Sequence, residues 1–386
     1  MSDTKKHYWF LGILVAGLVL RLLMPFRGYN FDIESYRIVA EIVANGGNVY
    51  AETDRYNYGP IWFFILRALD VLSDAGRSEL LSLRWKVAVF LTIIDVLIAA
   101  ILYRTYNLKV ASLFFLNPIS IVITGYHSQF DNLAILLGLL SVNAIDSGKS
   151  RRSNVLGLIL LGISLSVKHI LFIFPLWIAF RESRLSGKLL SLLIPYSIFA
   201  VGFLFYLPEG AAGILRNVFL YRSYNNAPFW DAFAPQSIYI SIPAFLLFIA
   251  TLLLLGLVWR RRILTDSLHL YLISLVIFSS AIANQYLAIC VPSIATQWNW
   301  AYAAYTLTGT LFLAVDTSGL HLAGLRDFLG WDGMGGYYLL VALLLLGLII
   351  KAFGKDGEGG DPVIRTIRAA ITWLVNETRA QLKAPW

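Results

Sequence analysis

Long apolar runs recur along this chain and constrain its fold more than any other feature. About twelve runs are spread over its 386 residues, and many approach the roughly 20 residues that a helix needs to cross a bilayer. Hydrophobic residues make up 58% of the sequence and charged residues only 14%, against roughly 25% charged residues in soluble domains. We therefore expect an all-α, polytopic transmembrane helix bundle of about 11 to 13 spans, with one continuous membrane domain over residues 1–353.

The charge pattern and the cysteine content argue against a nucleic-acid-binding protein, a disulfide-stabilised protein and a protein with a thiolate metal site. The net charge of +8 comes from lysines and arginines scattered through short loops between apolar runs, a pattern that membrane topology explains without nucleic-acid binding. The single cysteine, Cys290, lies in an apolar run, which excludes both a disulfide framework and a thiolate metal site. Lys5 and Lys6 precede the first apolar run, which lacks a small-residue cleavage pattern, so we expect an uncleaved first helix over about residues 8–26.

The basic residues of the short loops predict the orientation in the membrane. With a cytoplasmic N-terminus, every short basic group falls on the cytoplasmic side, as the positive-inside rule requires. The first extracytoplasmic loop then covers residues 27–84 and carries amphipathic helices at the outer interface, including the short segment 60–71. A second large outer loop covers residues 208–235. Residues 354–386 form a linker and an amphipathic helix (362–383) on the cytoplasmic membrane surface, so both termini are expected to be cytoplasmic.

In this topology, polar residues from distant parts of the sequence share the extracytoplasmic face. Polar residues at membrane depth are costly and usually face a protein cavity. A cavity with carboxylates on one wall and Lys, His and Arg on another suits a substrate that carries a phosphate and a nucleophilic hydroxyl. The set comprises Asp32, Glu34, the run 55–58 with Tyr58, His127, Gln129, Asp131, Lys168, His169, Arg216, Arg222, Asn284 and Gln285.

Several of these residues have a simpler structural explanation. Asp32 precedes an amphipathic segment and is equally well explained as the N-cap of a helix, with Glu34 in its first turn. If both residues were helical, their side chains would diverge by roughly 200°, so only a non-helical Asp32 can share a site with Glu34. His127 and Asp131 lie at a membrane exit, where both can cap helix ends. Lys168 can extend to the interface, but it lies where the topology disfavours positive charge, which favours phosphate binding.

Short motifs in a fixed order give the chain a family resemblance. An outer loop with Asp32 and Glu34 is followed by an aromatic-Tyr-x-Pro segment at 56–60, an Asn-Pro pair at 117–118 and the turn HSQFDN at 127–132. This turn is similar to the His-Phe-Gln-Tyr-Asn element of the endoplasmic-reticulum glucosyltransferases that build the lipid-linked oligosaccharide. It is also similar to the Ser-Tyr-Asp-Asn-Glu turn of the oligosaccharyltransferase catalytic subunit.

Three later segments extend the resemblance to about residue 300. Residues 166–175 resemble the Phe-Lys-Gln…Pro stretch of those glucosyltransferases, and residues 216–230 resemble their Arg-rich outer loop. Residues 284–286 are similar to the Ser-Gln-Tyr stretch of the GPI mannosyltransferase and of bacterial polyprenol-dependent mannosyltransferases. The chain thus resembles the GT-C superfamily of membrane glycosyltransferases, which use polyprenyl-phosphate-linked sugars. It departs from the pattern at Asp131, where the glucosyltransferases have Asn, and it lacks the large soluble domain of oligosaccharyltransferase.

The resemblance implies a GT-C-like fold and inverting transfer of a sugar, a hexose such as mannose or glucose, from a polyprenyl-phosphate donor. The acceptor is a hydroxyl of a glycolipid or glycan on the extracytoplasmic face. Asp32 is the expected general base, with Glu34 as the second catalytic carboxylate. The donor phosphate is assigned to Lys168, His169, Arg222 and Arg216, and the acceptor or sugar to Tyr58, His127, Gln129, Asp131 and Gln285.

The resemblance leaves the cofactor open, and other classes of function remain. A divalent cation, Mg²⁺ or Mn²⁺, held by Asp32, Glu34 and Asp131 is compatible with the relatives, which differ in their need for metal. The expected partners are the lipid-linked donor, the acceptor and membrane lipids, without nucleic acid. The alternatives are a transporter or flippase for a lipid-linked or anionic solute, which needs no proton acceptor, and a structural membrane subunit.

Overall fold

The protein is helical throughout the part of the chain that the structure describes. The structure is a computed structural model, and it describes residues 3–71, 79–148, 150–221, 227–233, 243–329 and 333–353. No strand occurs within these ranges. The α-helices are α1 (Asp3–Leu23), α2 (Asp32–Ala44), α3 (Val49–Glu52), α4 (Pro60–Val71), α5 (Glu79–Thr105), α6 (Leu108–Phe115), α7 (Pro118–Gly125), α8 (Asp131–Asp146), α9 (Arg151–Val167), α10 (Phe174–Arg181), α11 (Leu185–Val201), α12 (Leu207–Gly213), α13 (Pro228–Phe233), α15 (Ala244–Val258), α16 (Leu264–Ile277), α17 (Tyr286–Ile289), α18 (Val291–Thr296), α19 (Trp300–Val315), α20 (Ala323–Leu329) and α21 (Gly333–Phe353). Short 3₁₀ turns η1 (Met24–Phe26), η2 (His169–Leu171) and η3 (Leu204–Tyr206), and the π-helical turn η4 (Ile214–Phe219), join some of them.

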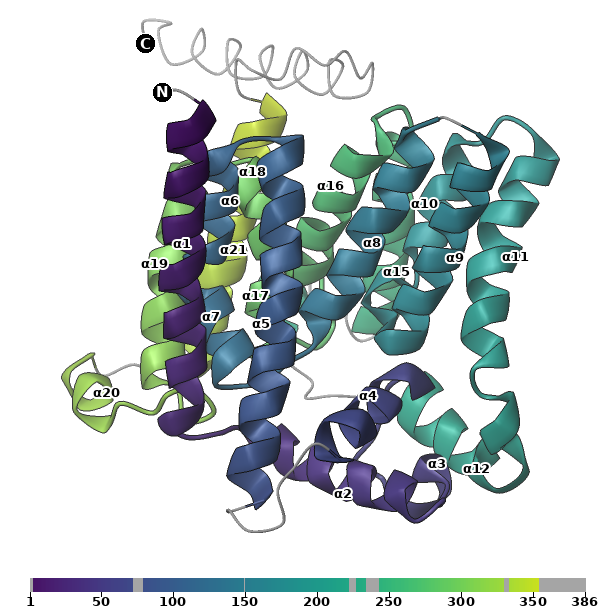
Figure 1. Ribbon diagram of the computed structural model, residues 1–386. Coiled ribbons are helices and arrows are strands. Elements are labelled where there is room, and N and C mark those ends of the chain that lie inside the picture. Colours follow the sequence, from purple (N-terminus) through teal and green to yellow (C-terminus); the bar gives the residue numbers. More distant parts are fainter. Residues whose placement is uncertain are drawn as a thin grey trace, which may run out of the picture.

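The helices form an upright bundle with a layer of short helices across one end. In Figure 1, α1, α5, α8, α9, α11, α16, α19 and α21 run roughly side by side, and α1 begins at the upper end. Helices α2, α3, α4 and α12 lie at the lower end, across the direction of the bundle. We call these four helices the transverse layer. The layer and the N-terminus therefore lie at opposite ends of the molecule.

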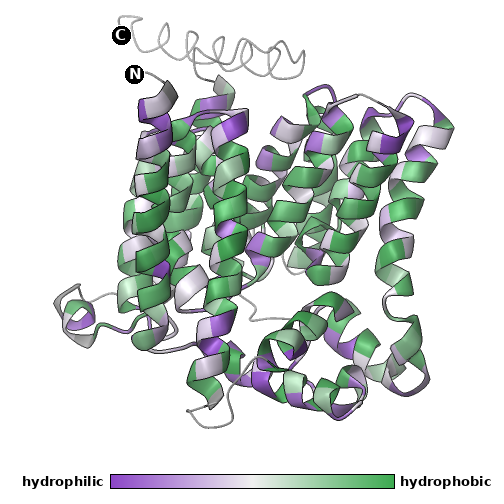
Figure 2. Ribbon diagram, viewed as in Figure 1, coloured by the Kyte–Doolittle hydropathy of each residue, from purple (hydrophilic) through white to green (hydrophobic). Residues whose placement is uncertain are grey.

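Length and composition make the bundle compatible with an integral membrane protein. Within the described ranges, four helical segments are long and apolar enough to cross a membrane, namely 4–26, 80–105, 185–219 and 335–352. A fifth span results if the bent pair α6 and α7 counts as one. Apolar residues dominate the middle of the bundle, and hydrophilic residues gather toward its ends and in the transverse layer (Figure 2). The window of α1 that meets these criteria is only 17% buried, as expected of a helix that faces lipid.

These four or five segments are fewer than the 11 to 13 spans expected from the sequence, because several apolar runs are divided into shorter helices. The Asn117-Pro118 pair shows the cause. The Asn117 side chain accepts a hydrogen bond from the Ile119 amide and Pro118 occupies the first helical turn, so a new helix begins there and α7 bends away from α6 by 49°. The helices α15, α16 and α19 are apolar but shorter than 18 residues. The expected C-terminal helix at 362–383 lies outside the described residues.

A buried network of polar groups ties the first part of the bundle together. The Arg21 guanidinium on α1 is fully buried and donates to Asp95 Oδ2 on α5 at 2.8 Å and to the Phe115 carbonyl at 2.7 Å. Thr124 on α7 donates to the same Asp95 oxygen at 2.8 Å, and Asn132 on α8 donates to the other oxygen at 2.8 Å. Buried charges are stable only when paired and hydrogen-bonded, and this network satisfies that condition. It also fixes the start of α8.

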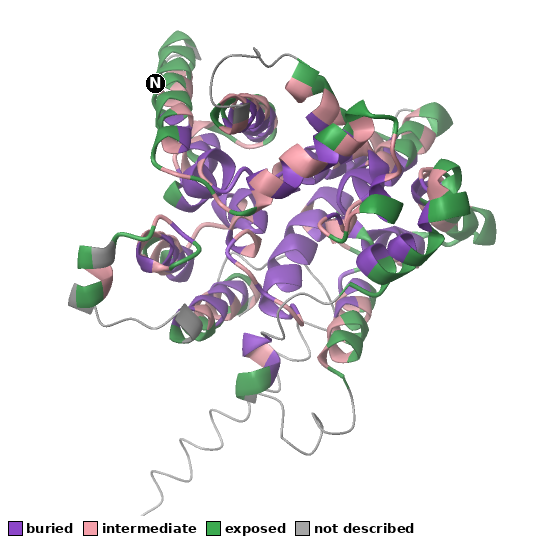
Figure 3. Ribbon diagram, turned by 90° about the horizontal axis from the view of Figure 1, so that it is seen from below, coloured by how far each residue is buried: buried purple, intermediate pink, exposed green. Residues whose placement is uncertain are grey.

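The transverse layer packs on the bundle through an amphipathic helix and a close backbone approach. The predicted apolar face of α2 is confirmed, since Ile33, Tyr36, Val39 and Ala40 are buried. Viewed from below in Figure 3, buried residues gather toward the middle of the molecule and exposed ones lie around it. A Cβ added to Gly59 would collide with the main-chain atoms of residue 166, at the end of α9. The loop before α4 is thereby held directly against the segment that carries Lys168.

Candidate functional site

Lys168 lies at the end of α9, inside the protein, and pairs with a carboxylate from another helix. Its backbone is extended (φ −153°, ψ 126°) and it forms the C-cap of α9, so the side chain leaves the helix axis. Its Nζ lies 2.7 Å from Asp131 Oδ2 and 3.3 Å from Gln129 Oε1. The side chain is only 8% exposed. Lys168 therefore does not extend to solvent, and this excludes the simpler explanation that it reaches the interface.

Asp32 joins this pair from the transverse layer. It is the first residue of α2, and its backbone amide donates to Asn30 Oδ1 at 3.0 Å. The Gln129 side-chain amide donates to Asp32 Oδ2 while its oxygen accepts from Lys168. We call Asp32, Gln129, Asp131 and Lys168 the polar cluster. Residues from α2, α9 and the segment that begins α8 thus meet at the end of the bundle that carries the transverse layer (Figure 1).

Aromatic rings enclose the lysine of the polar cluster. The Lys168 ammonium lies 5.0 Å from the centre of the Tyr58 ring and 4.8 Å from the centre of the Phe130 ring. Trp62 stacks on Phe130 with 4.0 Å between ring centres and 11° between ring planes. Aromatic faces attract cations and keep water out, so the charge of Lys168 acts in surroundings of low polarity.

Burial changes the acid–base behaviour of Asp32. Loss of hydration raises the pKa of this carboxyl, although the Lys168 charge and the Gln129 hydrogen bond act in the opposite direction. The charge on Arg55 also lowers its pKa, and Asp131 raises it. Asp32 is therefore a stronger proton acceptor than an exposed aspartate, and such a shift in a buried cluster is typical of functional sites.

The turn between α7 and α8 supplies two members of the cluster and is itself strained. Ser128 has a positive φ of 56°, which is uncommon for a residue other than glycine. His127 Nδ1 lies 2.9 Å from Asn30 Nδ2, which links the turn to the start of α2. Burial lowers the pKa of His127 to about 4, so this imidazole is neutral near pH 7. Strained, buried turns of this kind concentrate at functional sites.

Three buried polar atoms beside the cluster have no protein partner within the described residues. They are His127 Nε2, Ser128 Oγ and Asp131 Oδ1. An unpaired buried polar group costs about 1–3 kcal/mol. Such atoms, next to an ion pair, can be satisfied by a bound polar molecule, which supports the assignment of His127 and Asp131 to ligand contact.

The structure corrects the expected N-cap and separates the two carboxylates of α2. The N-cap position belongs to Phe31 and makes no side-chain cap bond, so Asp32 is not the N-cap. Both Asp32 and Glu34 are helical, and their side chains diverge as helical geometry requires. Glu34 accepts from the Tyr29 hydroxyl at 3.3 Å and lies 3.9 Å from Arg55. Glu34 therefore does not share the polar cluster.

Of the remaining predicted phosphate and sugar ligands, Arg216 lies away from the polar cluster, and the others stay predictions. Arg216 is 67% exposed and pairs with Asp54. His169 follows Lys168 in the chain, and burial together with the Lys168 charge lowers the pKa of its imidazole to about 4. Its Nδ1 has no hydrogen-bond partner in the described part of the chain. Gln285 forms the N-cap of α17 without a side-chain cap bond. Arg222 lies outside the described residues.

The carboxylates proposed for a divalent cation do not converge. Asp131 Oδ2 contacts the Lys168 ammonium, Asp32 Oδ2 accepts from Gln129, and Glu34 faces Arg55. Among the described residues, no group of three or more His, Cys, Asp or Glu side chains could hold a metal ion. As arranged, these residues do not fit a Mg²⁺ or Mn²⁺ site.

Two residues at the site were missed from the sequence. Asn30 contacts both the Asp32 amide and His127, and Tyr286 on α17 is close enough for the Asp131 charge to act on its hydroxyl. Asn30 lies two positions before Asp32, a spacing typical of a local side-chain turn, and this signal could have identified it. Tyr286 belongs to the motif at 284–286 but was not assigned to the site, because only the fold places α17 beside α8.

No protein-family model matches this chain, and no curated protein or solved structure shows significant similarity to it.

Proposed function

We propose that this protein is an integral membrane glycosyltransferase of GT-C-like fold. It transfers a sugar, a hexose such as mannose or glucose, from a polyprenyl-phosphate donor to a hydroxyl of a glycolipid or glycan acceptor. The transverse layer faces the extracytoplasmic side, where the reaction takes place. One observation carries the proposal: a half-buried carboxylate with a raised pKa, Asp32, lies in one hydrogen-bonded cluster with a buried lysine, Lys168.

In the proposed reaction, Asp32 and Lys168 of the polar cluster have different roles. Asp32 accepts the proton of the acceptor hydroxyl as the hydroxyl oxygen forms a bond to the anomeric carbon of the donor sugar. The bond from that carbon to the phosphate oxygen breaks on the opposite face, so the configuration inverts and the lipid phosphate leaves with the electron pair. Lys168 stabilises the negative charge that develops on the leaving phosphate. Positioned proton transfer of this kind contributes roughly 10²–10⁴ to the rate.

Lys168 retains the capacity to bind a phosphate. An ammonium group has three N–H donors, and Asp131 and Gln129 use two of them. The third is available for a phosphate oxygen, and a lysine binds phosphate as a point charge. Asp131 and Gln129 thus hold the lysine in place without occupying it fully. Gln129 also connects it to Asp32, which couples the position of the base to that of the phosphate site.

The competing proposal is a transporter or flippase for a lipid-linked or anionic solute. Such a protein would use Lys168 to bind phosphate but would need no proton acceptor. The aspartate distinguishes the two, because a glycosyltransferase needs Asp32 as a proton acceptor and a transporter does not.

The test is Asp32→Asn, with Glu34→Gln as a matched control on the same helix. Asparagine keeps the size of Asp32 but cannot accept a proton, so we expect sugar transfer to fall about 10²- to 10⁴-fold while donor binding persists. Glu34→Gln should change the rate only a few-fold, since Glu34 lies apart from the polar cluster. Transfer by the Asp32→Asn protein at the wild-type rate would refute Asp32 as the base.

A further inference from the structure

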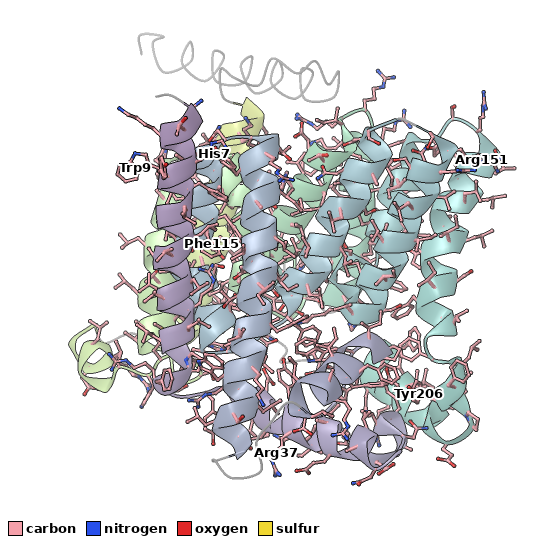
Figure 4. The ribbon with its side chains drawn as sticks, viewed as in Figure 1. His7, Trp9, Arg37, Phe115, Arg151 and Tyr206 are labelled. Atoms are coloured by element: carbon pink, nitrogen blue, oxygen red, sulfur yellow. The ribbon has the colours of Figure 1, made fainter. Side chains whose placement is uncertain are left out.

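A second concave site lies at the end of the bundle opposite the polar cluster. A cavity of about 710 Å³ opens where the start of α1, the end of α5 and the start of α6 meet. In Figure 4, His7 marks this part of α1, at the upper end of the bundle. None of the residues that line the cavity belongs to the proposed active site, so the cavity requires an explanation of its own.

The lining of this cavity carries positive charge. Lys6 from α1 and Lys109 from α6 both border it, together with Tyr103 and Tyr106. No carboxylate occurs among the described residues that line it. Asp146 and Asp266 act on Tyr106 from outside the lining, and Asp146 already accepts hydrogen bonds from the Thr265 amide and hydroxyl at 2.8 and 2.7 Å. The charge of the cavity therefore favours an anion.

The rest of the lining mixes the polar residues Asn107 and Ser112 with leucines, and exposed apolar residues follow Lys6 on α1. Leu113 borders the cavity on α6. On α1, Tyr8 and Trp9 are 71% and 63% exposed, and Leu11 follows at 59% (Figure 4). Aromatic side chains beside a leucine-rich surface are typical of the boundary between headgroups and acyl chains. A ligand at this position meets cations at one end and hydrocarbon at the other.

We propose that this cavity binds the headgroup of an anionic phospholipid from the leaflet at the N-terminal end of the bundle. Lys6 and Lys109 contact the headgroup phosphate, and the acyl chains run along the exposed apolar surface of α1. Basic pockets between membrane helices bind anionic headgroups in this way. The proposal depends on the position of the bundle in a membrane and is independent of the glycosyltransferase activity.

The test compares lipid binding by two double variants that lose the same charge. The purified full chain in detergent is titrated with phosphatidylglycerol or with phosphatidylcholine of the same acyl chains, and bound lipid is counted by native mass spectrometry. Lys6→Ala/Lys109→Ala should weaken phosphatidylglycerol binding about tenfold or more, about 1.4 kcal/mol, and leave phosphatidylcholine binding unchanged. The control Arg151→Ala/Arg152→Ala removes two exposed charges at the same end of the molecule, on α9, and should bind like the wild type.

A third variant tests whether lipid binding depends on the space inside the cavity as well as on its charge. Ser112 lines the cavity, and Ser112→Phe places an aromatic ring in it beside Lys109 while keeping both lysines. This variant should also bind phosphatidylglycerol about tenfold more weakly. The proposal is overturned if Ser112→Phe binds normally, if the two double variants lose equal affinity, or if millimolar inorganic phosphate displaces the lipid, since a free anion would then be the ligand.

Discussion

Asp32 and Glu34 lie two positions apart on α2 and differ in their exposure and in their polar partners. Asp32 accepts from Gln129 in the polar cluster and is largely removed from water, whereas Glu34 is 40% exposed and lies 3.9 Å from Arg55. A raised pKa follows for Asp32 from its lost hydration. Another carboxylate, placed about half a helical turn away, gives a surface ion pair of little energetic consequence.

Gln129→Ala should shift the acid limb of the pH–rate profile to higher pH. The Gln129 amide donates to the ionised form of Asp32, and its loss raises the pKa of that carboxyl further. A hydrogen bond to a charged group contributes about 1.5–3 kcal/mol, which corresponds to a shift of about one to two pH units. Because a base must be ionised to accept a proton, activity falls as the pH drops through this pKa.

The measurement is kcat/KM as a function of pH for the wild type and the variant, with Glu34→Gln as the control. The control should keep the wild-type limb. An acid limb that stays in place or moves to lower pH in Gln129→Ala would show that Asp32 is not the group that titrates.

For single residues, the sequence predicted charged side chains on one face of the protein, but it did not predict which of them meet inside the fold. Lys168 was identified because a positive charge at that position contradicts the topology, and its buried ion pair with Asp131 agrees with a functional role. Arg216 carried the same kind of charge, yet it pairs with Asp54 at the surface. Sequence position gives the side of the membrane but not the direction of a side chain, so it could not separate these two residues.

Helices α1, α5, α7 and α8 are joined by the Arg21–Asp95 network. This network holds Asn132, and Asn132 is the neighbour of Asp131 in the chain. The helix α8, which begins at Asp131 of the polar cluster, is therefore connected to a buried hydrogen-bonded network within the bundle. Pre-organised support of this kind keeps a site close to its productive geometry.

Arg21→Met should destabilise the protein far more than removal of an exposed arginine. Without its cation, Asp95 remains as an uncompensated buried charge, at a cost of about 3–5 kcal/mol. Arg37→Ala breaks an exposed pair with Glu41 on α2 and should cost at most about 1 kcal/mol (Figure 4).

Thermal unfolding in detergent measures the difference. The double variant Arg21→Met/Asp95→Leu, which removes both charges, should recover most of the lost stability. Equal melting temperatures for Arg21→Met and Arg37→Ala would contradict the role given to the network.

The sequence predicted the helical runs, but it did not predict the points at which a run is divided into shorter helices. The amphipathic period of α2 predicted its buried face, and the apolar runs predicted a helical bundle. The division of these runs depends on contacts across the fold. A local signal such as Asn117-Pro118 marks a bend, but its 49° angle depends on how α6 and α7 pack against their neighbours.

The two ends of the molecule carry different groups of polar residues. The polar cluster and the transverse layer lie at one end, and the N-terminus and the cavity proposed to bind an anionic headgroup lie at the other (Figure 1). Hydropathy and charge predicted two such faces, with the N-terminus on the cytoplasmic side, and this orientation stays a prediction.

Cysteine labelling should place the two ends on opposite sides of the membrane. Arg37→Cys lies in the transverse layer and Arg151→Cys lies at the opposite end of the bundle (Figure 4). Cys290 is fully buried, so the wild-type chain supplies a silent background. A membrane-impermeant maleimide added to intact cells should label Arg37→Cys, and Arg151→Cys only after permeabilisation. Labelling of both variants from one side would contradict the spanning arrangement, and the reverse pattern would contradict an extracytoplasmic site.

The central claim is that the molecule breaks the bond between a sugar and a lipid phosphate. It is tested by incubating the purified protein in lipid vesicles with a panel of polyprenyl-phosphate hexoses and pentoses and a glycolipid acceptor. The account predicts that one donor is consumed, that equal amounts of polyprenyl phosphate and glycosylated acceptor form, and that Asp32→Asn abolishes both products. Recovery of every donor intact, with one of them moved across the bilayer, would contradict the account and identify a transporter.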